Sequence, residues 1–250
     1  MSDKIKPFQL SSEYYDLLYG DKNYELEANY IIKHLNDLGL QGRRILEFGC
    51  GTGKHAIQFI KKGYDVSGID ISQEMVSIAS NIKKFDCCLG DIRKTKLKKK
   101  FDVILSLFHV MSYQITNRSV NEAMKNAYEN LDEEGFFFFD IWYAPAVLSI
   151  RPEKRLKQFN SKNFSIKREA NPELISNKNM VKVNYNIEVE KKNKEKINFS
   201  EIHEMRYFSI PEIEMFANCN GFELIEANEW MNKKTPSDSS WCISISLKKI

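Results

Sequence analysis

The sequence predicts an α/β protein built on a doubly wound, mostly parallel β-sheet. Short apolar segments alternate with amphipathic helical segments through residues 24–142, the pattern of repeated strand–helix units. Two of the apolar segments, residues 101–108 and 135–142, are almost wholly apolar, which is typical of strands buried on both faces. A glycine-rich turn directly follows the first predicted strand, as in sheets that bind a ligand at their carboxyl edge.

Local periodicity and glycine punctuation predict the individual elements. Residues 24–38 carry apolar side chains at helical spacing, and Gly39 ends the pattern. Ser72 is the expected N-cap of a later helix. The predicted strands cover residues 43–49, 64–70, 86–89, 101–108 and 135–142, and the helices between them cover residues 54–63, 73–82 and 119–131.

The character of the chain changes after Pro145. Residues 151–201 are polar and lysine-rich, and the two-residue alternation over 180–190 indicates antiparallel strands. We therefore expect an inserted antiparallel cap over residues 145–205, after the fifth strand. Strands at 203–209, 222–227 and 241–249 and a helix at 211–220 complete the pattern. The whole chain, residues 1–250, then forms one domain in which residues 1–40 make a helical N-terminal lid.

Composition narrows the class of protein. A net charge of +3 over 250 residues is too small to indicate nucleic acid or an anionic membrane as a partner. Five cysteines are an odd number without a metal-type repeat, so we expect reduced thiols and no metal. Neither a signal peptide nor an apolar stretch of about 20 residues is evident, which favours a cytoplasmic protein.

The pattern with the clearest chemical meaning is Glu47-x-Gly49-x-Gly51-x-Gly53, with Asp70 at the end of the next strand. Glycines let the backbone of a turn approach a ligand closely, since no Cβ stands in the way. An acidic side chain at the tip of the second strand can accept hydrogen bonds from both hydroxyls of a ribose. The pattern therefore predicts a nucleoside site at the carboxyl edge of the sheet.

The spacing separates this turn from two other glycine-rich turns. The dinucleotide fingerprint is G-x-G-x-x-G, and a phosphate loop ends in G-K-[ST], whereas here His55 follows Lys54. The E-x-G-x-G-x-G form resembles motif I of class I S-adenosylmethionine-dependent methyltransferases. This resemblance implies a seven-stranded Rossmann-like sheet, S-adenosylmethionine as cofactor and S-adenosylhomocysteine as product.

The resemblance also implies roles for individual residues. In this family the motif I acid, here Glu47, lies near the methionine end of the cofactor, the glycine turn passes under the adenosine, and Asp70 holds the ribose. The family also has apolar and acidic side chains near the adenine and a cofactor-binding residue after the fourth strand. By position, the residues near the adenine are Ile71, Met75, Asp91 and Ile92, and the residue after the strand is Leu107.

A narrower resemblance points to the acceptor. The segments YYDLLYGDKNYELEA, FDIWY and HEMRYFSIPEIEMFANCNGFELIE look like those of bacterial nucleotide-sugar methyltransferases, including the dTDP-amino-sugar N-methyltransferases. That family's tyrosine-rich N-terminal segment covers the active site. By position, Tyr15 and Tyr19 would contact the cofactor, and Tyr15 would also contact the reacting groups. Lys22 and Tyr24 would contact the acceptor. Alternatively, the tyrosines only hold the segment against the sheet.

One departure concerns the histidine beyond the fourth strand. The sugar N-methyltransferases often carry it a few residues further on, where this chain has Tyr113, and its own histidine is His109. His109 is the candidate base, because imidazole titrates near neutral pH, although a purely structural role stays open. The remaining candidates for acceptor binding are Phe108, Tyr113, Trp142, Tyr143, His203 and Arg206, of which Arg206, like Lys22, could pair with a phosphate.

The sequence thus leads to a ranked set of functions. The first is methyl transfer to an amino or hydroxyl group of a nucleotide-linked or phosphorylated sugar, as a precursor of a bacterial surface polysaccharide. The second is O-methylation of a phosphoramidate or sugar acid in capsule synthesis. The third is a cofactor-binding or protein-modifying domain without small-molecule catalysis. A monomer and a homodimer are both compatible with the sequence.

Overall fold

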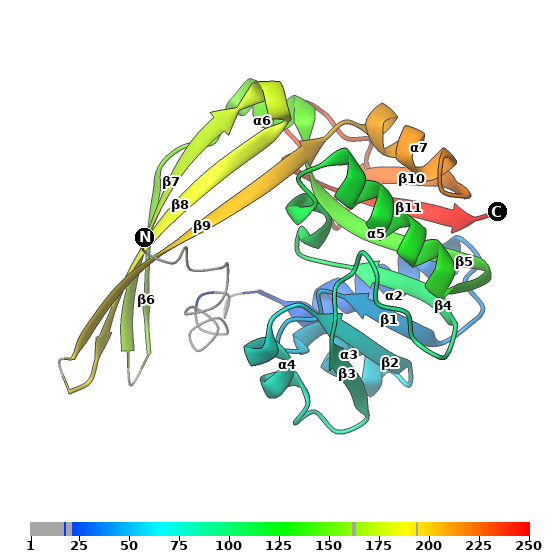
Figure 1. Cartoon of the computed structure of the whole chain (residues 1–250), viewed down its shortest axis with the longest axis horizontal. Helices are drawn as coiled ribbons and strands as arrows, with labels where there is room; N and C mark the ends of the chain where they lie inside the picture. The colour runs from blue at the N-terminus through cyan, green and yellow to red at the C-terminus, as the bar shows by residue number, and fades with distance from the viewer. Residues whose placement is uncertain (1–17, 19–21, 162–163, 194) are drawn as a thin grey trace. The chain divides into compact units, whose positions relative to one another are not determined.

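The computed structural model describes residue 18, residues 22–161, 164–193 and 195–250, and these form parts of two compact units (Figure 1). Unit 1 contains residues 1–22 and 151–206, and unit 2 contains residues 23–150 and 207–250. Half of the expected N-terminal lid, residues 1–17 and 19–21, lies outside the described residues. We describe each unit by itself.

Seven strands of unit 2 follow the order β3-β2-β1-β4-β5-β11-β10, counted over the described residues. The last two residues of β9 (Lys196–Phe208), Tyr207 and Phe208, also pair parallel with Trp142 and Tyr143 of β5. Strands β1 to β5 run parallel, while β11 pairs antiparallel with both β5 and β10. The predicted α/β, mostly parallel, Rossmann-like fold is confirmed. The strands are β1 (Arg44–Phe48), β2 (Asp65–Asp70), β3 (Phe85–Leu89), β4 (Phe101–Ser106), β5 (Leu131–Tyr143), β10 (Phe222–Glu229) and β11 (Cys242–Lys249).

Helices cover both faces of this sheet (Figure 1). On one face pack α2 (Tyr24–Asp37), α3 (Lys54–Lys61) and α4 (Gln73–Ala79), and on the other α5 (Asn117–Asn130) and α7 (Ile210–Asn218). The run of phenylalanines in β5 joins the two layers: Phe136 and Phe138 enter the core under α2 and α3, and Phe137 and Phe139 enter the core under α5 and α7. This alternation explains why the strand has no polar face.

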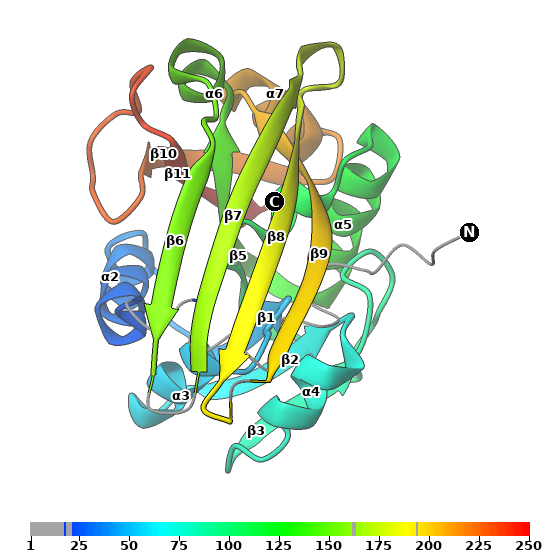
Figure 2. The same ribbon diagram turned by 90° about the vertical axis from the view of Figure 1, so that its left-hand side faces the viewer.

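Unit 1 contains a four-stranded antiparallel sheet in the order β6-β7-β8-β9, which Figure 2 shows face-on. Its strands are β6 (Arg155–Asn160), β7 (Phe164–Ile175), β8 (Met180–Lys191) and β9 (Lys196–Phe208), and the last two residues of β9 belong to unit 2. The alternation predicted over 180–190 is present, because Val181, Val183, Ile187 and Val189 are buried. Residues Ala144–Ile150, at the start of the expected insertion, form helix α6 of unit 2.

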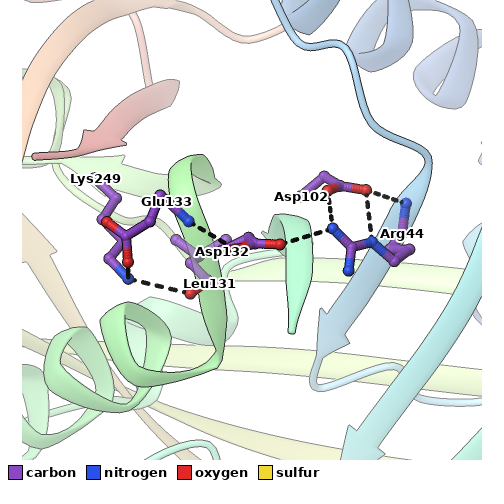
Figure 3. A network of polar contacts seen from close by, with 6 residues as sticks. All are labelled: Arg44, Asp102, Leu131, Asp132, Glu133 and Lys249. Atoms are coloured by element: carbon purple, nitrogen blue, oxygen red, sulfur yellow. Dashed lines mark hydrogen bonds and ion pairs between the residues drawn. The ribbon is translucent and has the colours of Figure 1, made fainter. Parts of the chain in front are cut away.

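A polar network holds the amino ends of the central strands together (Figure 3). Arg44, the first residue of β1, donates from its backbone N–H and Nε to Asp102 Oδ2 (2.8 and 3.1 Å) and from Nη2 to Asp132 Oδ2 (2.9 Å). The buried Lys249 Nζ donates to Leu131 O and Glu133 Oε1. The carboxyl edge of the same strands therefore remains available for a ligand.

Within the described ranges, no helix combines the length and the apolar character needed to cross a membrane.

Candidate active site

The glycine turn after β1 is held tightly to β2 and is open on one side. The N–H groups of Gly49 and Cys50 both donate to Ile69 O (2.8 and 3.1 Å), and the three motif glycines have positive φ angles of 70, 53 and 78°. A Cβ on Gly49 would lie 2.6 Å from Val110 Cγ2, but a Cβ on Gly51 would meet no atom within 4 Å. The space beside Gly51 can thus hold a ligand against bare backbone.

Asp70 lies at the tip of β2, beside this opening. Its Oδ2 accepts from Gly51 N (2.8 Å) and its Oδ1 from Ser72 N (2.9 Å), so the carboxylate is fixed by the turn itself. Burial raises the pKa of Asp70, and the backbone hydrogen bonds oppose that rise. A second acceptor lone pair on each oxygen remains for ligand hydroxyls.

Glu47 is a buried acid at the carboxyl end of β1, only 3% exposed. Its Oε2 has no hydrogen-bond partner among the described residues. Burial, with the charge of Asp70 as a second cause, raises the pKa of Glu47 to about 8, while the Ala56 N–H opposes the rise. A buried carboxyl with an unused oxygen is costly by itself, and a cationic ligand group would relieve that cost.

The residues expected near adenine differ in their surroundings. Ile71 is 72% exposed and offers an apolar surface just beyond Asp70, whereas Met75, Ile92 and Leu107 are buried in the protein. The Asp91 carboxylate accepts hydrogen bonds from the backbone N–H and the guanidinium of Arg93, and these hold its pKa below the usual range. Contacts of these residues with the cofactor stay predictions.

His109 is held by an aspartate from the neighbouring strand. Its Nδ1 lies 2.7 Å from Asp140 Oδ2, and its backbone N–H donates to the same oxygen (3.1 Å). Phe108 and His109 both adopt φ of 65°, an uncommon conformation for residues other than glycine that tends to occur at functional sites. Asp140 is buried, and the His109 side chain is 21% exposed, so the pair presents a partly accessible imidazole backed by a carboxylate.

Aromatic rings and one thiol surround this pair. The His109 ring stacks on Phe108 (5.6 Å between centroids) and meets Trp142 edge-on (6.0 Å). Cys242 Sγ lies 3.6 Å from Asp140 Oδ2 and 3.9 Å from His109 Nδ1. The three donor atoms are close enough to hold a metal ion, but 2.7 Å between nitrogen and oxygen is a hydrogen-bond distance and favours a shared proton.

The remaining predicted site residues come from several different elements. Tyr15 and Tyr19 lie outside the described residues. Tyr24 begins α2, and its ring packs edge-on against His55 (4.8 Å). Tyr113 ends a short 3-10 helix (Val110–Tyr113) after His109, and Tyr143 ends β5. Three predicted acceptor residues belong to unit 1, namely Lys22, His203 and Arg206.

Within unit 1, His203 is buried beside an acidic and an aromatic side chain. Both His203 and Glu201 are buried, their Nε2 and Oε2 atoms are 3.3 Å apart, and the ring of Tyr185 meets the imidazole edge-on (5.0 Å). These contacts lie on the face of the antiparallel sheet that carries its buried residues.

Sequence reasoning missed Asp140, Cys242, Glu27 and His55. For Asp140 a signal existed, because it is the only charged residue in the run GFFFFDIW, and a lone charge in a buried strand usually has a partner. His55 was noted only as a mismatch to the phosphate loop. Its contacts with Glu27 and Glu47 depend on the packing of α2 against α3, which local patterns do not reveal.

Comparison with known proteins identifies a methyltransferase domain. Residues 45–135, from β1 into β5, match the methyltransferase domain family. YqeM of Bacillus subtilis, which carries a methyltransferase name, is 28% identical over 241 residues that cover 93% of each chain. Residues 45–135 therefore carry a methyltransferase domain, and the relatives support a class I S-adenosylmethionine-dependent methyltransferase. The predicted cofactor, S-adenosylmethionine, is thereby confirmed.

Two further methyltransferases are similar to this one. A dTDP-3-amino-3,4,6-trideoxy-α-D-glucopyranose N,N-dimethyltransferase of Streptomyces venezuelae is 28% identical over 142 residues, which cover 55% of this methyltransferase and 60% of that one. The amino pentose methyltransferase CalS10 of Micromonospora echinaspora, solved with S-adenosylmethionine bound, shares the fold with a TM-score of 0.78, 17% identity and 99% coverage of both chains. Several curated relatives are matched over only about half of their length, 54 to 60%.

Proposed function

We propose that this methyltransferase transfers a methyl group to the amino group of a nucleotide-linked sugar. The observation that carries the proposal is the His109–Asp140 pair, a partly exposed imidazole backed by a buried carboxylate at the carboxyl edge of the sheet. The similarity to an amino-sugar N,N-dimethyltransferase supports an amine as the acceptor.

The residues at the glycine turn fit the cofactor. Gly51 leaves open space at the turn, and Asp70 offers acceptor oxygens for the ribose hydroxyls. Glu47 offers a cationic group a buried oxygen that has no partner within the described part of the chain. Bound there, S-adenosylmethionine supplies a methyl group already activated on a sulfonium. The protein then needs to align the acceptor and exclude water.

His109 prepares the acceptor. An alkyl ammonium has no lone pair to attack a methyl group, so it must first lose a proton. With Nδ1–H donated to Asp140, the neutral His109 presents a basic Nε2 that accepts this proton, and the nitrogen lone pair becomes the nucleophile. The imidazolium that forms is stabilised by the Asp140 carboxylate.

The aromatic side chains beside His109 bind the sugar in this proposal. Trp142 contacts both His109 and Trp241 (5.9 Å), and Phe108 stacks on His109, so their faces border the reacting nitrogen. Stacking of a sugar ring on Trp142 positions the amine without adding charge. Binding of a phosphate by Lys22 or Arg206 stays a prediction.

O-methylation is the second candidate. A hydroxyl acceptor needs a base even more than an amine does, and the His109–Asp140 pair supplies one. We expect either reaction to take place in the cytoplasm, as a step in the synthesis of a surface polysaccharide or capsule. The reducing compartment in this proposal fits the five cysteines, which are present as thiols.

The experiment is methyl transfer from isotope-labelled S-adenosylmethionine to matched acceptors, followed by mass spectrometry. Each nucleotide-linked amino sugar is paired with the sugar that carries a hydroxyl at the same carbon. We expect labelled product with the amino member. Product only with the hydroxyl member would establish the O-methylation alternative, and no product with either, despite cofactor binding, would contradict both.

A further inference from the structure

Three ionisable side chains form a buried row beneath the glycine turn. Glu27 Oε2 of α2 lies 2.7 Å from His55 Nε2 of α3, a hydrogen bond, and the other ring nitrogen, Nδ1, lies 3.8 Å from Glu47 Oε1 of β1. All three residues are less than 9% exposed. A histidine from α3 is thus placed between carboxyl groups of two other elements, directly below the predicted cofactor site.

The charge of Glu47 matters for a cofactor that carries positive charges. Because burial raises the pKa of Glu47 to about 8, the carboxyl is mostly neutral at neutral pH in the free protein. S-adenosylmethionine carries a sulfonium and an ammonium, and a nearby cation favours the ionised form of a carboxyl group. A cofactor bound beside Glu47 therefore favours loss of the proton from this carboxyl group.

We propose that His55 accepts this proton, so that Glu47 ionises under the bound cofactor without a proton being released to solvent. The O–H bond of Glu47 breaks and an N–H bond forms at His55 Nδ1. The new imidazolium is paired with Glu27, and the new carboxylate is paired with the cofactor. The 3.8 Å gap requires the two side chains to approach by about 1 Å to reach hydrogen-bond distance.

The other ionisable groups around Glu47 are poorly suited to this role. Both oxygens of Asp70, on β2, already accept backbone hydrogen bonds, and its charge is one cause of the raised pKa of Glu47. Burial raises the pKa of the Cys50 thiol strongly, so Cys50 stays neutral. Tyr24 of α2 contacts the ring of His55. Among the described residues, His55 is the base that faces Glu47.

The experiment is isothermal titration with S-adenosylmethionine near pH 6.5, in buffers that differ in ionisation enthalpy. For the wild-type protein we expect almost no proton release and a Kd that changes little between about pH 6.5 and 8.5. For His55→Gln we expect close to one proton released per cofactor bound. Its Kd should then rise about tenfold for each pH unit below 8, because Glu47 must lose its proton to the buffer.

Two further variants keep the test decisive. Glu27→Gln preserves the shape of the side chain but removes the negative charge that stabilises the His55 imidazolium. We therefore expect a number of protons released that lies between the wild-type and His55→Gln values. His34→Gln is the matched control: this histidine of α2 is equally buried but bonds to Ser246 Oγ (2.8 Å), and its loss should leave proton release unchanged.

Two results would overturn the inference: a full proton released by the wild type near pH 6.5, or a His55→Gln variant with wild-type proton release and pH dependence. The inference rests on the assignment of the cofactor, but its failure is distinguishable from a failure of that assignment. A wild-type protein that binds S-adenosylmethionine and releases its proton contradicts only the role of His55.

Discussion

His109 Nδ1 lies 2.7 Å from Asp140 Oδ2, and the His109 backbone N–H donates to the same oxygen. One carboxylate oxygen therefore fixes both the ring and the backbone of the candidate base. This double contact accounts for the left-handed conformation of His109, because that conformation brings its N–H and its ring to the same side. Asp140 is thus a positioning residue in the proposed reaction.

Replacement of Asp140 should separate positioning from folding. We expect Asp140→Asn to lower kcat by about 10- to 100-fold, since it cannot stabilise the imidazolium, with little change in the KM for the cofactor. His109→Gln should lower kcat at least as much. Cys242→Ser is the control, because Cys242 contacts both residues yet has no role in the proton transfer, and its kcat should stay within about twofold. Steady-state kinetics measure these effects, and wild-type kcat in Asp140→Asn would refute the positioning role.

Replacement of Gly51 by alanine tests whether the cofactor occupies the open space beside the glycine turn. Both Gly51 and Gly39 have positive φ angles, 53 and 97°, and neither has an atom within 4 Å of an added Cβ. Each alanine variant should therefore lose about 1–2 kcal/mol of folding free energy from backbone strain. Only Gly51→Ala should weaken cofactor binding, by about tenfold or more, because its Cβ occupies space that the cofactor needs. Equal affinities in the two variants would show that the cofactor does not approach Gly51.

The Arg44 network should contribute stability that depends on pH. Partial burial opposes ionisation of Asp102, but the hydrogen bonds from Arg44 outweigh it and lower the pKa of Asp102. A lowered pKa stabilises the fold above the unfolded value of about 3.9, and the gain disappears as pH falls through the folded value. We expect Asp102→Asn to cost about 1–2 kcal/mol at neutral pH, a range that allows for the exposure of Arg44. Urea unfolding at several pH values measures it, and an undiminished difference below about pH 3 would contradict the linkage.

Gly42 provides a second way to disturb the same network. A Cβ at Gly42 would lie 1.9 Å from Asp102 Cγ, so Gly42→Ala must displace the carboxylate from Arg44. We expect a loss of stability at least as large as that of Asp102→Asn, and the two losses should not add in the double variant. Additive losses would mean that Gly42 acts through something other than Asp102.

The sequence predicted what depends on local patterns. The fold follows from alternating strands and helices, and the cofactor motif from glycine spacing with Glu47 and Asp70, all within 24 residues of one another. The His109–Asp140–Cys242 cluster could not be predicted in this way. Its members come from the end of β4, from β5 and from β11, and the antiparallel pairing of β11 with β5 brings Cys242 to the edge beside Trp142. The contact between His55 and Glu27 likewise depends on helix packing.

The central claim, that this chain binds S-adenosylmethionine at Glu47, Gly49–Gly53 and Asp70, is tested most directly by titration calorimetry with the cofactor. We expect one site per chain with micromolar affinity for the wild type. Asp70→Ala should lose most of that affinity, because it removes both the ribose acceptors and the hydrogen bond to Gly51 N. Absence of binding by the folded wild-type protein, or unchanged affinity in Asp70→Ala, would contradict the account.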